Sequence, residues 1–266
     1  MKKLLLTYDV EEFDWRLRGG RPLPMTEQID ITAEGLRKLL PIHERHRAPA
    51  TFFVTGTFAT AEPELVAQVA DMGHEVGVHG LEHGDDYAKL EPDVAVGRLE
   101  RARQMVEEAS RQKAVGMRTP RLRHCLASVV RGAGYSYDAS PHPTWIPGRY
   151  FGLHFGRSPW RENGITRVPI SVLPGFRMPV SWMWFQLAGP RLGLVGARLA
   201  LLGAPYLHLY FHPWEAVPLR PLGAPLPFSH RTGEAFLKAL DHLLTRSAGR
   251  LEPTTVKEIL APTPTA

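Results

Sequence analysis

The amino-acid sequence predicts an α/β fold built on a parallel sheet, either closed as a barrel or open as a doubly wound sheet. Strand-like and helix-like segments alternate along the chain, and β–α–β alternation implies parallel strands. About seven strand-like segments fall within 266 residues, which suits both architectures. The composition, 44% hydrophobic and 22% charged, excludes collagen-like, disordered and coiled-coil chains. We expect one domain over residues 1–260 and a disordered tail over 261–266.

Each element is predicted from its residue pattern. Thr32–His46 repeats apolar residues at helical spacing, although Pro41 should kink the helix. The helix Glu62–Met72 has Pro63 in its first turn and Gly73 at its C-terminal end, as helices favour. The predicted strands are Lys3–Tyr8, Ala50–Thr55, Glu75–Val78, Val115–Arg118, Tyr135–Asp138, Thr166–Val172 and Leu207–Phe211. The remaining predicted helices are Pro92–Ser110, Arg123–Arg131 and Gly233–Thr245.

Two regions are less regular. Ser140–Asn163 is rich in proline, glycine and aromatic residues, and we interpret it as a long loop over one end of the sheet. Met178–Leu202 is rich in tryptophan and leucine, but Pro179, Gly189 and Pro190 interrupt it. We therefore expect no transmembrane span there. Its tryptophans suit either packing of a loop and helix on the barrel or contact with a membrane surface or a lipid tail.

Charge and cysteine content narrow the functional classes. The net charge is +5 and the pI about 9.5, yet no run of five or six basic residues is present, so we expect no nucleic-acid partner. A single cysteine, Cys125, excludes an internal disulfide and a cysteine-based zinc site, and we read it as a small apolar helix residue. The N-terminal apolar run stops after Leu6, too early for a secretory signal. We expect a cytoplasmic protein, peripheral to the membrane if it acts there.

Four predicted strand ends carry residues of chemical interest. Asp9, Glu11, Glu12 and Asp14 follow the first strand, and ligands bind beyond the carboxyl ends of parallel strands. The other three motifs are HGLEH at 79–83, RTP at 118–120 and FHPWE at 211–215. Each alone also suits a structural role, as a helix cap, a packed turn histidine or a surface arginine. Together they supply carboxylates, a histidine pair, an arginine and a single histidine, which fits a metal-dependent hydrolase.

The histidine pair carries the metal hypothesis. If the turn after Glu75–Val78 is helical, His79 and His83 lie on one face at i, i+4 spacing. Paired imidazoles with a carboxylate from another strand end suit a divalent transition metal. Arg118 is suited to hold a carboxylate, and His212 is suited to acid–base chemistry near neutral pH.

In this order, the motifs resemble those of the polysaccharide deacetylases, carbohydrate esterase family four with its NodB homology domain. The matching segments are TYDVE at 7–11, ATFFVTG at 50–56, GHEVGVHGLEH at 73–83, RTP at 118–120, YSYDAS at 135–140 and YFHPWE at 210–215. The last is similar to the form found in the exopolysaccharide-associated branch. The resemblance implies a distorted (β/α) barrel with about seven parallel strands.

The resemblance also implies roles. Asp9 would be the general base, Arg118 would orient it, and His212 would protonate the leaving amine. His79 and His83 would bind one divalent metal, zinc first, with cobalt or nickel as alternatives. The family usually has two adjacent aspartates, whereas here Val10 follows Asp9, so we predict Glu11 as the third ligand and Glu12 as the second choice.

The resemblance points to an N-acylated amino sugar or polysaccharide, soluble or lipid-linked, as the substrate. We assign Arg121, Trp214 and Asp138 to substrate binding, and the backbone N–H of Arg121 to the oxyanion. The cation at Arg121 suggests an anionic substrate group. Two alternatives remain open: another C–N hydrolase, acting on a cyclic amide or ureide, and a metal-free, non-catalytic homologue that acts as a binding protein.

Overall fold

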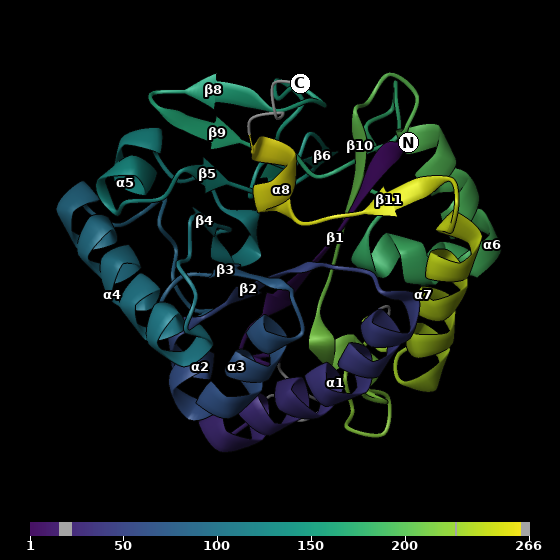
Figure 1. Cartoon of the computed structure of the whole chain (residues 1–266), viewed down its shortest axis with the longest axis horizontal. Helices are drawn as coiled ribbons and strands as arrows, with labels where there is room; N and C mark the ends of the chain where they lie inside the picture. The colour runs from purple at the N-terminus through teal and green to yellow at the C-terminus, as the bar shows by residue number, and fades with distance from the viewer. Residues whose placement is uncertain (16–22, 227, 262–266) are drawn as a thin grey trace.

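The structure is a computed structural model that describes residues 1–15, 23–226 and 228–261. A curled sheet runs through the molecule, and helices cover its outside (Figure 1). The strand order is β10-β1-β2-β3-β4-β5-β9-β8, and β11 pairs with β1. All neighbours are parallel except β8 and β9. The predicted α/β class with a parallel sheet is confirmed.

The described elements have the following bounds. The strands are β1 Lys2–Val10, β2 Thr51–Val54, β3 Glu75–Val78, β4 Gly116–Met117, β5 Tyr137–Asp138, β6 Trp145–Ile146, β7 Tyr150–Phe151, β8 Trp160–Glu162, β9 Ile165–Arg167, β10 Tyr206–Phe211 and β11 Leu251–Pro253. The α-helices are α1 Met25–His46, α2 Gly56–Ala61, α3 Pro63–Asp71, α4 Pro92–Ser110, α5 Ala127–Gly132, α6 Trp182–Ala200, α7 Glu234–Ser247 and α8 Val256–Leu260. Two short 3-10 helices are η1 Pro120–Leu122 and η2 Pro213–Ala216.

The sheet curls into a distorted barrel. Beyond β9, the backbone N–H of Ser171 donates to the carbonyl of His208 in β10 at 3.0 Å. The Tyr206 hydroxyl donates to the carbonyl of Pro169 at 3.1 Å. These bonds join the segment after β9 to the strand at the other end of the order. A barrel of this kind brings the carboxyl ends of its strands around one opening.

The central strand β1 is buried from Leu4 onward, and its even and odd residues face the two sides of the sheet. Helix α1 packs closely against η2, the segment that follows β10. A Cβ atom at Gly35 of α1 would lie 2.0 Å from the carbonyl oxygen of Pro213, so only glycine permits this approach. This contact fixes η2, and with it the residue before it, His212.

Several predicted elements match closely, and others need correction. The bounds of β3 and α4 are those predicted, and Pro41 lies within α1, which continues to His46. The helix predicted from Arg123 begins only at Ala127, so the interpretation of Cys125 as a helix residue was wrong. Cys125 is buried in the irregular segment before α5.

The region 140–163 is not one long loop, because it contains β6, β7 and β8. Helix α2, strand β11 and helix α8 were not predicted. The predicted tail from 262 to 266 lies outside the described residues. Within the described residues, no helix combines the length and apolarity that crossing a membrane requires.

Candidate active site

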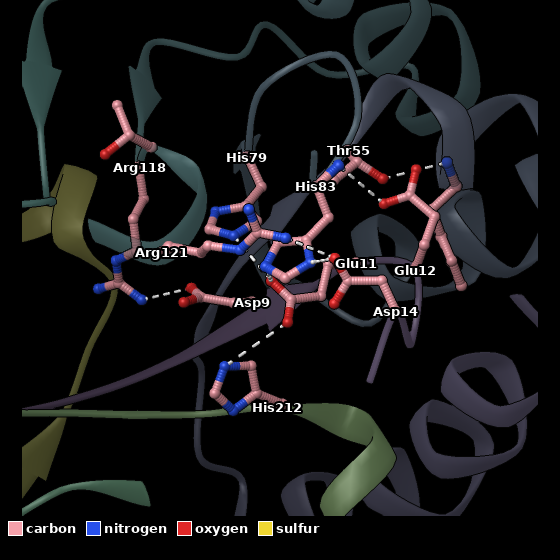
Figure 2. A network of polar contacts seen from close by, with 12 residues as sticks. Asp9, Glu11, Glu12, Asp14, Thr55, His79, His83, Arg118, Arg121 and His212 are labelled. Carbon is pink, nitrogen blue, oxygen red and sulfur yellow. Dashed lines mark hydrogen bonds and ion pairs between the residues drawn. The ribbon is translucent and has the colours of Figure 1, made fainter. Parts of the chain in front are cut away.

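The polar residues of the predicted motifs meet at one end of the sheet (Figure 2). Asp9 lies near the end of β1, and Glu11 follows that strand. His79, Arg118 and His212 come directly after β3, β4 and β10. Because these strands lie within the run β10-β1-β2-β3-β4 of the curled sheet, their carboxyl ends bring together residues from distant parts of the chain.

Glu11, His79 and His83 converge on one point. Glu11 Oε2 lies 3.0 Å from His79 Nε2 and 3.1 Å from His83 Nε2. One ligand atom from each residue lies within 4.8 Å of the other two. Ligand atoms that are each about 2.1 Å from one divalent ion stand roughly 3 Å apart. The three buried side chains therefore have the composition and spacing of a divalent metal site.

The electrostatic surroundings of Glu11 also favour a bound cation. Burial raises the pKa of Glu11 to about 8; His83 opposes this shift, while Asp9, Asp14 and Glu12 add to it. A divalent ion between the carboxylate and the imidazoles would supply the missing positive charge. Two imidazoles and one carboxylate are also the protein ligands of many catalytic zinc sites.

The neighbouring carboxylates have different partners. Glu12 Oε2 accepts a hydrogen bond from the backbone N–H of His83 at 3.1 Å, and its Oε1 has no hydrogen-bond partner among the described residues. Asp14 Oδ2 lies 3.0 Å from His83 Nδ1 and accepts a hydrogen bond from Arg121 Nη2 at 2.5 Å. Glu11 is thus the carboxylate beside Nε2 of both imidazoles, whereas Asp14 contacts the other ring nitrogen of His83, Nδ1.

The turn from His79 to His83 is not helical, although we expected the two imidazoles on one face of a helix. Gly80 has a φ of +85°, a left-handed conformation that interrupts a helix. Its carbonyl accepts a hydrogen bond from the backbone N–H of Gly56 at 3.0 Å. An irregular loop held against the start of α2 therefore carries the histidine pair.

Arg118 is fully buried and fixes Asp9. Its Nη1 donates to Asp9 Oδ1 at 2.7 Å, its Nε donates to a main-chain carbonyl at 3.1 Å, and its Nη2 lies 2.8 Å from His208 Nε2. A guanidinium only donates, so His208 accepts and is neutral. Burial would raise the pKa of Asp9, but Arg118, His79 and His212 together hold it below its usual value. Asp9 is therefore an ionised carboxylate in a fixed orientation.

His212 approaches Glu11 from the opposite side. Its ring stacks on Trp214 with centroids 4.4 Å apart, and its Nδ1 lies 3.2 Å from Glu215 Oε1. Its Nε2 lies 3.8 Å from Glu11 Oε1. Burial lowers the pKa of His212 to about 3, so the imidazole is neutral at neutral pH. It can act as an acid only after taking up a proton released during a reaction.

A cavity of about 430 Å³ opens over this cluster. Asp9, Glu11, His83 and His212 line it. Its walls also include aromatic and basic side chains, namely Trp15, Arg121, Arg149, Tyr150, Trp182 and Tyr210. Aromatic faces beside polar groups suit a sugar ring with an amide substituent.

The predicted substrate residues occupy different positions. Arg121 lines the cavity, and both Arg121 and Leu122 have left-handed backbones, with φ values of 55° and 53°. Such strain in non-glycine residues is frequent at functional sites. Trp214 is fully buried, yet it lines the same cavity, stacks on His212 and donates a hydrogen bond from its Nε1 to Glu11 Oε1 at 3.4 Å. Asp138 lines a second cavity of about 490 Å³, where it pairs with Arg167.

Sequence reasoning missed several residues around these cavities. His208 and Glu215 contact Arg118 and His212, and Glu215 had a signal in its position within the FHPWE motif. Arg149 and Tyr150 line both cavities, but they lie in the segment interpreted as a loop. His142 lines the second cavity, is 4% exposed, and has no hydrogen-bond partner for either ring nitrogen within the described part of the chain.

Comparison with known proteins finds similar sequences and similar folds. The family model "Polysaccharide deacetylase" matches residues 22–137, which include His79, His83 and Arg118. A chitooligosaccharide deacetylase from Sinorhizobium fredii is 34% identical over 112 residues, 41% of this chain and 42% of that protein. The chain spans less than two thirds of the length of the curated relatives it matches first.

Solved structures share the fold. A protein from Mycobacterium smegmatis assigned as a polysaccharide deacetylase has 20% identity and a TM-score of 0.65, covering 97% of this chain and 89% of its own. A carbohydrate esterase family four pseudoenzyme from Bacillus anthracis has 17% identity and a TM-score of 0.58, covering 98% of this chain and 66% of its own. The same fold thus occurs in a protein described as a pseudoenzyme, so the arrangement of the site must carry any argument about activity.

Proposed function

We propose that this chain, which the family model "Polysaccharide deacetylase" matches over residues 22–137, is a metal-dependent hydrolase that removes an acetyl or other small acyl group from an N-acylated amino sugar. The observation that carries this proposal is the convergence of Glu11, His79 and His83 beside the Asp9–Arg118 pair. A ligand set and an oriented carboxylate at one cavity are the parts that amide hydrolysis by water requires.

The chain's own residues supply the proton transfers. Asp9 accepts a proton from the attacking water while Arg118 holds its other oxygen. A divalent cation bound by Glu11, His79 and His83, zinc by the nature of its ligands, would lower the pKa of that water and polarise the acyl carbonyl.

The remaining steps stabilise charge and release the amine. The backbone N–H of Arg121, on the strained segment that lines the cavity, hydrogen-bonds the developing oxyanion, a contact worth about 3–4 kcal/mol per donor in other enzymes. His212 is neutral at rest, so it receives a proton before it passes one to the leaving nitrogen. Water adds across the C–N bond, and a free amine and a carboxylate result.

The cavity and the relatives both support this substrate class. The chitooligosaccharide deacetylase that resembles this chain is named for an N-acetylated sugar oligomer. Trp182 and Tyr150 provide aromatic walls, and Arg149 provides a cation beside them. We therefore favour an N-acylated amino sugar with a nearby anionic group, free or lipid-linked.

One experiment separates this proposal from its competitors. Zinc affinity is measured by calorimetry for the wild type and for His79→Ala/His83→Ala, and acetate release is measured from N-acetylglucosamine oligomers. We expect about one ion per chain, lost in the variant, together with acetate release. Metal binding with no release from any N-acyl sugar, but turnover of a cyclic amide or ureide, would favour the other hydrolase class. Absence of metal uptake would favour a non-catalytic binding protein.

A further inference from the structure

Helix α6 exposes apolar residues where a helix on a globular domain usually exposes polar ones. After the break at Gly189, the side chains Leu192, Val195, Leu199 and Leu202 recur at three- and four-residue spacing. All four are exposed, and Leu192 is 65% exposed. They form a continuous aliphatic stripe along the outer face of α6 and the turn that follows it.

The charged side chains of the segment that contains α6 are all positive. From residue 163 to 214 the sequence contains four arginines and no lysine, aspartate or glutamate. Two of these arginines, Arg191 and Arg198, are exposed on α6 beside the aliphatic stripe. The outer face of the helix therefore combines exposed aliphatic side chains with uncompensated positive charge.

A shallow groove between α6 and α7 continues this surface. Its volume is about 250 Å³, and its apolar lining includes Leu194, Leu201, Leu207 and Leu243. Its charged lining residues are Lys2, Arg198, Arg246 and Arg250. None of these four cations has a carboxylate partner among the residues that the structure describes. Figure 1 shows α6 and α7 side by side at one edge of the molecule, away from α4.

An exposed loop extends the surface beyond the end of α6. Arg157 donates to the carbonyl of Leu202 at 2.9 Å, and Arg177 donates to the carbonyl of Phe155 at 3.2 Å. These bonds tie the loop that follows β9 to the C-terminal turn of α6. Phe176, at the tip of that loop, is 97% exposed. Another large apolar side chain is thus exposed on a loop that is linked, through residues 155–157, to the end of α6.

We propose that this surface, made of the α6 stripe, the Phe176 loop and the cationic groove, binds an anionic lipid membrane. Aliphatic and aromatic side chains would enter the acyl boundary, and the cations would lie at the level of the lipid phosphates. Symmetric pairing with a second copy is less favourable, because a two-fold contact would bring two surfaces of uncompensated positive charge together.

The position of α6 relates this surface to the active-site cavity. Trp182, at the first turn of α6, lines that cavity, while the far end of the helix reaches Lys2 near the start of β1. The stripe begins after Gly189, so it lies on the half of α6 that extends away from the cavity. This inference needs no catalytic activity, so it can fail or succeed separately from the proposed function.

The test is vesicle flotation with the whole chain. Vesicles of phosphatidylcholine alone are compared with vesicles containing 30% phosphatidylglycerol, at 0.1 and 0.5 M NaCl. We expect binding to the anionic vesicles only, and weaker binding at the higher salt concentration. Equal binding to both vesicle types, or no binding to either, would overturn the proposal.

Two variants locate the contact. Arg198→Gln/Arg246→Gln/Arg250→Gln should lower the partition coefficient roughly 100-fold, and Leu192→Gln/Leu199→Gln should lower it at least about tenfold. The matched control Arg101→Gln/Lys113→Gln/Arg161→Gln removes the same charge from exposed sites elsewhere and should retain most of the binding. Circular dichroism and thermal unfolding establish that each variant is folded.

Size-exclusion chromatography with light scattering tests whether a second copy of the chain, and not a membrane, covers this surface. We expect a wild-type oligomeric state that the leucine variant does not change. A dimer that Leu192→Gln/Leu199→Gln dissociates, in a protein that binds no vesicles, would assign this face to a second copy. Loss of vesicle binding in the control variant to the same degree would show that net charge alone is responsible.

Discussion

Two pairs of buried histidines lie at opposite ends of strand β3, where His74 precedes the strand and His79 follows it, and the pairs have different partners. His43 and His74 stand edge to face with ring centroids 5.4 Å apart, whereas His79 and His83 are nearly parallel with centroids 6.2 Å apart. His43 Nδ1 donates to the carbonyl of Ala48 at 2.8 Å, so its Nε2 accepts from the Tyr8 hydroxyl at 2.7 Å.

The difference lies in the neighbours of the rings, not in their burial. The core pair meets a phenol, a main-chain carbonyl and a backbone N–H, and burial lowers the pKa values of His43 and His74 to about 4 and about 3. The other pair meets the carboxyl group of Glu11, whose pKa burial raises to about 8. A histidine pair is thus a candidate ligand set where a carboxylate converges on it, and core packing where none does.

Without the Glu11 carboxylate, His79 and His83 should bind metal as poorly as the core pair His43 and His74. This is the largest effect we expect. Glu11→Gln keeps the size of the side chain but removes its negative charge, so zinc affinity should fall by more than about 100-fold and activity should be lost with the metal. Calorimetric zinc titration measures the change. Without metal, the variant should unfold at the same or a higher temperature, because burial disfavours the ionised form of Glu11 and raises its pKa to about 8, and glutamine is neutral.

Glu12→Gln is the matched control for that substitution. Its amide oxygen can still accept the hydrogen bond from the backbone N–H of His83, so zinc affinity should stay within about threefold of the wild type. A larger loss in Glu12→Gln than in Glu11→Gln would reverse the assignment of the third ligand and contradict the comparison of the two histidine pairs.

The sequence predicted the parts of this site that depend on local patterns. Short motifs at strand ends located Asp9, Glu11, His79 and His83, because parallel strands bring their carboxyl ends together. The helical turn assumed for the histidine pair was wrong, since Gly80 adopts a left-handed backbone, yet the imidazoles still converge. That convergence depends on long-range packing, which residue spacing does not describe.

Other features depended on contacts between distant segments. No local pattern pairs Arg118 with His208, because that contact joins β4 to β10. Strands β6 to β8 are two or three residues long, too short for alternation to be visible in the segment 140–163. The second cavity and His142 were missed for the same reason.

Asp9→Asn tests whether this carboxylate works as a base and not as a ligand. Asparagine keeps a hydrogen-bond acceptor for Arg118 but takes up no proton, so kcat should fall about 10²- to 10⁴-fold. Zinc affinity should change much less than in Glu11→Gln. Steady-state kinetics and zinc titration together give the answer. Loss of the metal in Asp9→Asn would place Asp9 among the ligands and remove the base from the mechanism.

Asp14→Asn sharpens the comparison at the outer side of His83. Asp14 lies 3.0 Å from His83 Nδ1, so it orients the ring and keeps Nε2 directed toward Glu11. Partners of this kind are worth about 10- to 100-fold in metal affinity, and the variant should lose that much. Cobalt-substituted protein offers a second readout, because a changed ligand field alters its visible spectrum. An unchanged spectrum and affinity would reduce Asp14 to a surface partner of Arg121.

Substitution in the core pair should change the pH dependence of stability and leave the zinc affinity unchanged. His43 is neutral in the folded state with a pKa of about 4, whereas an unfolded histidine has a pKa of about 6.5. Between these values the unfolded chain binds more protons, so stability is full above pH 6.5 and falls as the pH is lowered. Lowering the pH from 7 to 5.5 should cost roughly 1 kcal/mol of unfolding free energy for this histidine. Urea unfolding of the wild type and of His43→Gln at both pH values measures this loss of unfolding free energy, and zinc titration is the control. The variant should lose less stability than the wild type on acidification and keep its zinc affinity. Because His43 contacts no carboxylate in the described structure, a variant that lost zinc instead would show that the two histidine pairs are not separate in function.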